Sequence, residues 1–108
     1  MFAGIPTASY TAALPWYEQV LGRPPDILPN ASEGMWTLSD SGSVYLVTDP
    51  EHAGGGVVTL AIDDLDALLE RLSGHGIAPV RLDSMPAGRK ASFTDAEGNV
   101  LAFVELAG

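Results

Sequence analysis

The sequence has no cysteine and few basic residues. Without cysteine, the chain cannot form a disulfide, a thiolate zinc site or a cysteine nucleophile. Only 5 of its 108 residues are Lys or Arg, against 14 Asp and Glu, which gives a formal net charge of −9. Nucleic-acid phosphates and anionic membrane surfaces would repel such a chain, so we expect neither as a partner. The same charge favours a neutral or cationic small molecule over an anionic one.

Long hydrophobic runs are also missing. No stretch approaches the roughly 20 apolar residues that cross a bilayer, and residues 1–6 lack the basic start of a signal peptide. We therefore expect a cytoplasmic protein. A composition of 46% hydrophobic and 18% charged residues is typical of a globular chain. At this length we expect a single domain, residues 1–108, with one modest core.

The first half of the chain predicts a strand, a helix and two further strands. Residues 2–8 are a short apolar run, and the helix at residues 11–21 has Ser9 or Thr11 as its cap and Gly22 as its stop. Proline is tolerated in a first helical turn, so Pro15 predicts a helix start near Thr11. Residues 35–38 and 44–47 are strands joined by a tight hairpin.

The second half repeats this order. Residues 57–62 form a strand, Asp63 or Asp64 caps a helix, and Gly74 or Gly76 ends it. Leucines 65, 68, 69 and 72 give that helix one apolar face. Residues 78–82 form an edge strand, and two more strands flank a turn in which Asp95 bonds the amides and Gly98 has a positive φ.

Equivalent positions in the two halves lie 55 residues apart, as with Ser9 and Asp64 at the helix caps. This repeat predicts an α+β fold of two βαβββ modules that share a curved mixed sheet. Module one spans residues 1–49, the linker residues 50–56 and module two residues 57–108. We expect the helices on one face of the sheet and a ligand cleft on the other.

Four motifs carry a resemblance that covers nearly the whole chain. They are ALPWYEQVLG at residues 13–22, IDDLDAL at 62–68, Gly-Ile at 76–77 and DAEGNV at 95–100. Their order and spacing resemble the vicinal oxygen chelate superfamily, also called the glyoxalase/bleomycin resistance/dioxygenase family. Ala96 stands where that family usually has proline.

Enzymes of that superfamily bind a divalent metal, and the resemblance places the ligand positions near Phe2, Leu46, Val57 and Ala102. None of these side chains can ligate a metal. Among the adjacent residues, Tyr45 alone offers an oxygen. We therefore expect no metal and no other cofactor. The resemblance then implies the metal-free branch, whose members sequester antibiotics and are small, acidic and dimeric.

Strand alternation predicts which side chains line the cleft. In the first module they are Phe2, Gly4, Met35, Thr37, Val44 and Leu46, and in the second Val57, Thr59, Ala61, Val100, Ala102 and Val104. The candidate ligand-binding residues are Phe2, Met35, Thr37, Leu46, Val57, Thr59, Lys90, Ser92, Ala102 and Val104. We expect no catalytic residue among them, because this lining is apolar with a few hydroxyls and offers no acid–base pair.

The sequence thus predicts a homodimeric protein that binds an apolar or aromatic, neutral or cationic small molecule such as an antibiotic. One alternative is a glyoxalase-like lyase or isomerase that works without the usual metal ligands. Its acid and base would come from Tyr45, Asp83, His75, Lys90 or Glu105. A second alternative is an interaction module in which the cleft is a vestige.

Several conspicuous side chains have structural interpretations. The acidic residues at 63, 64 and 66 suit a helix N-terminus better than a cation site. Trp16 and Tyr17 are expected in the core, and Trp36 is expected to point toward the helix. Arg89 and Lys90 either grip a ligand at the mouth of the cleft or protect an edge strand.

Overall fold

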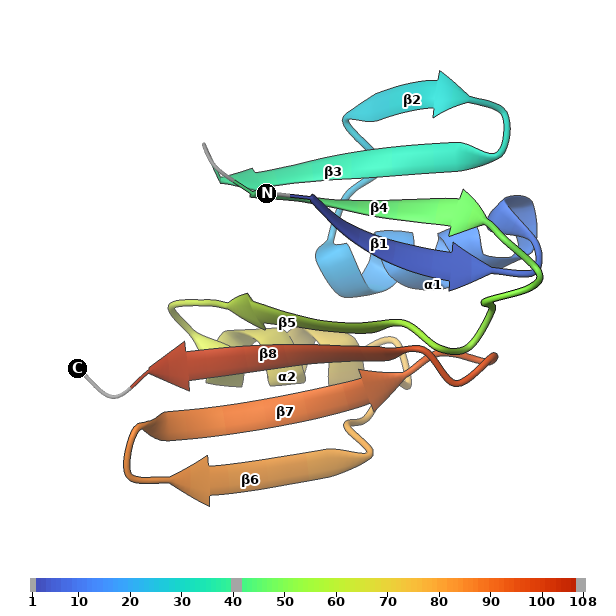
Figure 1. Cartoon of the computed structure of the whole chain (residues 1–108). Helices are drawn as coiled ribbons and strands as arrows, with labels where there is room; N and C mark the ends of the chain where they lie inside the picture. Colours follow the sequence, from blue (N-terminus) through green and yellow to red (C-terminus); the bar gives the residue numbers. More distant parts are fainter. Residues whose placement is uncertain (1, 40–41, 107–108) are drawn as a thin grey trace.

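The computed structural model describes residues 2–39 and 42–106 and has two βαβββ modules, which confirms the predicted fold class (Figure 1). Module one contains β1 (Phe2–Thr7), α1 (Tyr10–Leu21), β2 (Ile27–Asn30), β3 (Glu33–Ser39) and β4 (Gly42–Thr48). Module two contains β5 (Val57–Ala61), α2 (Leu65–Ser73), β6 (Arg81–Met85), β7 (Gly88–Thr94) and β8 (Val100–Leu106). Neither described helix has the length and apolarity to cross a membrane.

The eight strands form two sheets rather than one. The strand orders are β1-β4-β3-β2 and β5-β8-β7-β6, and in each sheet the first pair is parallel and the others are antiparallel. The edge strands β1 and β5 lie side by side without a hydrogen-bonded ladder between them. Both helices cover the same side of the pair, which leaves the opposite side uncovered (Figure 1).

Helix α1 starts one residue earlier than predicted. The Ser9 side chain accepts a hydrogen bond from the backbone N–H of Ala12 at 3.4 Å, and Gly22 ends the helix with a φ of 84°. A left-handed φ favours glycine there. Pro15 therefore lies in the second turn rather than the first, on the exposed side of the helix, where its ring meets solvent.

Helix α2 follows the predicted leucine pattern. The Asp64 carboxylate caps it by accepting the N–H of Ala67 at 3.0 Å, and Gly74 ends it. Leu65 and Leu72 are fully buried, while the two leucines between them are packed partly against the core. The amphipathic face thus attaches α2 to its sheet.

The edge strands are where prediction from sequence was weakest. Sequence reasoning assigned no strand to Ile27–Asn30, since a segment containing proline suits a strand poorly. Strand β6 begins at Arg81, later than predicted, because Pro79 precedes it and cannot donate to a ladder. Both β2 and β6 are free edges, which is where irregular pairing costs least.

The core lies between the helices and the sheets. Trp36 is fully buried and points toward α1, as predicted, and its indole N–H donates to the carbonyl of Arg23 at 2.9 Å. Its ring lies 6.5 Å from that of Tyr17, which is also fully buried. In module two, Phe93 and Phe103 meet edge to face at 5.9 Å. Each module therefore has an aromatic centre under its own helix.

Candidate functional site

The side of the two sheets away from the helices is the candidate site, and we call it the open face. Burial alternates along β5, where Val57 is 72% exposed and Val58 is 6% exposed. On β8, Leu101 and Phe103 pack in the core, as predicted. The predicted faces of these two strands are therefore correct, and the open face of module two carries residues 57, 59 and 61 of β5 and 100, 102 and 104 of β8.

The predicted face of β4 was wrong. Val44 and Leu46 were expected in the cleft, but they are 1% and 0% exposed and belong to the hydrophobic core. Tyr45 and Val47 point to the open face instead, because neighbouring residues alternate along a strand. Leu46 therefore cannot touch a ligand on the open face.

Strand register brings several predicted residues of module two into rows across the sheet. Thr59 pairs with Ala102, which pairs with Ser92. The next row joins Val104 to Lys90. Ala102 is only 1% exposed although it lies on the open face, because a methyl group is short compared with its neighbours. The centre of this sheet is thus apolar, with a hydroxyl on each side.

The other predicted residues lie on the sheet of module one. Met35 pairs with Tyr45, which pairs with Gly4 on β1, so these three share a row of the open face. Thr37 is exposed on the same side of β3. The side chain of Phe2 lies outside the described part of the structure.

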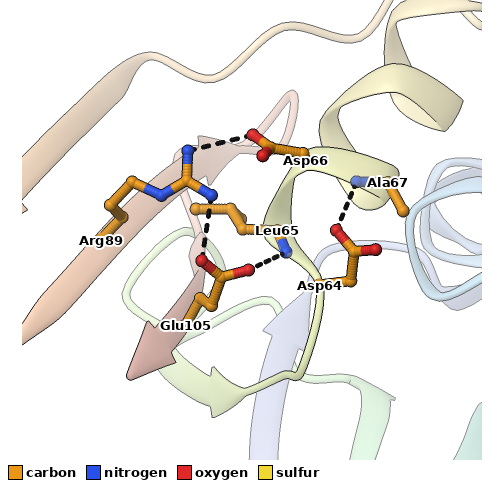
Figure 2. Close-up of polar contacts among 6 residues, drawn as sticks. All are labelled: Asp64, Leu65, Asp66, Ala67, Arg89 and Glu105. Atoms are coloured by element: carbon orange, nitrogen blue, oxygen red, sulfur yellow. Dashed lines mark hydrogen bonds and ion pairs between the residues drawn. The ribbon is translucent and has the colours of Figure 1, made fainter. Parts of the chain in front are cut away.

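Arg89 does not face the open side. Its guanidinium lies at the N-terminus of α2, where it donates to Asp66 and to Glu105, each at 3.0 Å (Figure 2). The other oxygen of Glu105 accepts the N–H of Leu65 at 2.8 Å. That backbone hydrogen bond, followed by the one from Arg89, lowers the pKa of Glu105, and the two carboxylates raise the pKa of Arg89. Of the basic pair, only Lys90 lies on the open face.

A polar network joins the two modules at one end of the β1–β5 junction. The Asp95 carboxylate accepts the hydroxyl of Tyr17 at 2.5 Å and the side-chain amide of Asn99 at 2.9 Å. That amide also donates to the carbonyl of Pro6, while its oxygen accepts the N–H of Gly56, both at 2.8 Å. Burial and the contact with Asp95 raise the pKa of Tyr17. Asp95 bonds the turn amides as predicted, but its link to α1 was missed.

Two hollows lie near the junction of the modules. One, of about 540 Å³, has an apolar lining with Arg71 as its one basic residue. Arg71 reaches from α2 to donate to the carbonyls of Gln19 and Val20 at the end of α1. The other, of about 600 Å³, includes Gly4 and Val57 of the open face and part of the linker between the modules. Of the candidate binding residues, Thr59 borders the first and Val57 the second.

Comparisons with known proteins show which family has this fold and sequence. The family model of the Glyoxalase/Bleomycin resistance protein/Dioxygenase superfamily matches residues 2–103, and the chain belongs to that superfamily. The structure is similar to that of a glyoxalase/bleomycin resistance protein from Catenulispora acidiphila DSM 44928, with 35% identity, a TM-score of 0.92, and coverage of 99% of this chain and 97% of that one.

Two further solved structures share the fold at lower identity. TnmS3, an antibiotic binding protein from Streptomyces sp. CB03234, is 26% identical with a TM-score of 0.78, over 98% of this chain and 93% of that one. The bleomycin-binding protein of Streptomyces verticillus, solved with copper(II)-bleomycin, is 18% identical with a TM-score of 0.77, over 99% and 95%. None of the curated proteins matches this chain.

The residues at the expected metal-binding positions do not fit a divalent metal. Val57 and Ala102 offer no donor atom, and Leu46 points into the core. Within residues 2–39 and 42–106, no three His, Asp or Glu side chains gather closely enough to hold an ion. A divalent metal needs nitrogen, oxygen or sulfur ligands, and the side chains at these positions supply none.

Proposed function

We propose that this protein binds and sequesters a small apolar or aromatic molecule, neutral or cationic, on its open face without changing it chemically. An antibiotic is the kind of ligand we have in mind. The observation that carries the proposal is the Thr59–Ala102–Ser92 row, in which a methyl group lies between two hydroxyls. Ala102 is one of the positions where the family resemblance places a metal ligand. Such a lining is typical of a small-molecule pocket.

The electrostatics support the same ligand class. A net charge of −9 attracts cationic molecules and repels anionic ones, while a neutral molecule is not opposed by it. Two ionisable groups that could act as an acid or base are already held in contacts away from the open face, since Glu105 is bound to Arg89 and Asp95 to Tyr17. The similarity to TnmS3, described as an antibiotic binding protein, also favours binding over catalysis.

We further propose that the protein acts as a cytoplasmic homodimer. Each sheet has one side uncovered and a free edge at β2 or β6. A second copy would cover apolar side chains such as Val57 and would deepen the shallow open face into a cleft.

The test combines native mass spectrometry with a charge placed in the site. The wild type should bind the neutral apolar dye Nile red and any co-purified ligand, and it should release the ligand unchanged. Thr59→Glu should abolish binding with little change in melting temperature, because Thr59 is exposed and its carboxylate would project into the cleft. Ala102→Glu should also abolish binding, because Ala102 lies between Thr59 and Ser92 at the centre of the row.

Ala78→Glu is the matched control, because it adds the same charge at an exposed position before β6. It should bind Nile red as the wild type does. Equal binding by Thr59→Glu and the wild type would disprove the open-face site. Conversion of the bound molecule into a product would favour the alternative of a metal-independent lyase or isomerase.

A further inference from the structure

We propose that Tyr45 is an aromatic platform on the open face and that the ligand it accepts is a planar aromatic cation. This inference rests on the proposed function and specifies the ligand class for the same face. It is carried by the contact between Tyr45 and Gly4 and by the acidic residues beside that contact.

The Tyr45 ring lies against the backbone of β1. Gly4 is the register partner of Tyr45, and a Cβ atom at Gly4 would lie 2.6 Å from Cζ, 2.7 Å from the hydroxyl oxygen and 2.9 Å from Cε2 of the ring. The φ of Gly4 is not positive, so the backbone conformation does not require glycine there. What the missing side chain provides is room for the ring, which crosses from β4 over β1 toward the junction with β5.

This position leaves the ring available to a ligand. One side of the ring is against Gly4, while Tyr45 as a whole is only half-buried on the open face. Among the described residues, its hydroxyl has no hydrogen-bond partner that would fix the ring for a structural purpose. A flat aromatic molecule gains most from a ring held in this way, because offset stacking needs two planar surfaces.

The charge beside the platform favours a cation. The hollow that Gly4 borders is also lined by Glu51 and His52, and its lining contains no Lys or Arg. His52 is itself bonded to the carboxylate of Asp49 at 2.9 Å. A positive ring on Tyr45 would be attracted both by the π-electrons of the phenol and by these carboxylates. Lys90 lies on the other sheet, paired in register with Asp83.

Three probes separate flatness from charge, with binding followed by isothermal titration calorimetry. N-methylquinolinium is flat and charged, 2-naphthol is flat and neutral, and N,N-dimethyldecahydroquinolinium is charged but not flat. The wild type should bind N-methylquinolinium most tightly, by about tenfold over the saturated cation, the range of one stacking and cation–π contact.

Variants then test the platform itself. Gly4→Ala should lower the affinity for N-methylquinolinium about tenfold and change the affinity for the saturated cation by less than about twofold. The atoms displaced are the flexible end of the Tyr45 side chain, so the fold should persist. Tyr45→Leu should act likewise, whereas Tyr45→Phe should bind as the wild type does. Glu51→Gln should lower the affinity for both cations and leave the affinity for 2-naphthol unchanged.

Gly74→Ala is the control for a glycine replacement, because Gly74 has an ordinary helical φ of −63° and lies at the end of α2. It should leave all three affinities unchanged. Equal affinity of the wild type for the flat and saturated cations would overturn the platform, as would full N-methylquinolinium binding by Gly4→Ala. Binding of Nile red that Thr59→Glu abolishes would still support the proposed function, so the two failures are distinguishable.

Discussion

Asp95 accepts one hydrogen bond across the junction of the two modules and three from residues of its own turn. Its carboxylate accepts the hydroxyl of Tyr17, two backbone N–H groups of its own turn and the side-chain amide of Asn99. The residue is 8% exposed, and a buried carboxylate is tolerated only when its oxygens are satisfied. This turn therefore orders its own hairpin and also joins the C-terminal module to α1.

Removing the Tyr17 hydroxyl should destabilise the fold without changing ligand binding. Tyr17→Phe deletes a hydrogen bond to a charged group at a buried site, which costs about 1.5–3 kcal/mol. Urea unfolding should show the loss as a lower midpoint with an unchanged slope. Tyr45→Phe is the control, and it should change the free energy of unfolding by less than about 0.5 kcal/mol, as at other surface positions. Similar losses in both variants would contradict the role of Asp95.

The lowered pKa of Glu105 makes part of the stability depend on pH. Because the folded pKa lies below the ordinary 4.5, the ionised carboxylate stabilises the fold above pH 4.5, and this contribution is lost as pH falls through the folded pKa. Glu105→Gln should therefore melt below the wild type at pH 7. The difference in melting temperature should shrink at pH values under 4.5, where the wild-type carboxylate also becomes protonated. A difference that stays constant with pH would show that Glu105 acts by packing alone.

At the scale of elements, strands β4 and β8 show that the repeat carries more information than local alternation. The 55-residue spacing pairs Leu46 with Leu101, which was correctly predicted to face α2. Applying the spacing to β4 would have put Leu46 in the core as well. Local alternation failed there because residues 44–47 are apolar or aromatic throughout, so no polar residue marks the outward face.

Core and open-face positions should respond very differently to truncation. Phe103→Ala and Leu46→Ala each leave a cavity in the core, and they should cost roughly 3–5 and 2–5 kcal/mol. Val57→Ala on β5 should cost much less, since the valine is 72% exposed. Thermal melting of the three variants measures these losses of stability. A normal melt for Phe103→Ala together with unfolding by Val57→Ala would mean that the faces of the sheet are reversed.

At the scale of the whole molecule, the two modules are held together mainly by side chains. The Asp95 network and the hydrogen bonds from Arg71 of α2 to the end of α1 both cross a junction that has no strand ladder. The molecule measures 40 × 29 × 24 Å, with one broad side of the sheets uncovered. Such an arrangement is suited to pairing with a second copy.

We expect sedimentation at micromolar concentration to give a mass of twice 11.3 kDa. The physical reason is that a chain of this size buries a modest share of its surface, while Leu28, Val80 and Leu106 are each more than 60% exposed. Dilution should release monomers with a shift in melting temperature, because association stabilises the folded state. A single species of 11.3 kDa at micromolar concentration would contradict the dimer.

The sequence alone predicted the two modules, the places where both helices begin and end to within about two residues, and the amphipathic face of α2, while it left Ser9 or Thr11 and Asp63 or Asp64 open as the caps. Each of these follows from local chemistry or from the repeat, both of which are written along the chain. Only the tertiary structure decided that the strands form two sheets, that Leu46 is in the core, that Arg89 binds Glu105 and that Tyr45 lies over Gly4. These depend on which distant segments meet, and residue spacing does not specify the register or packing between them.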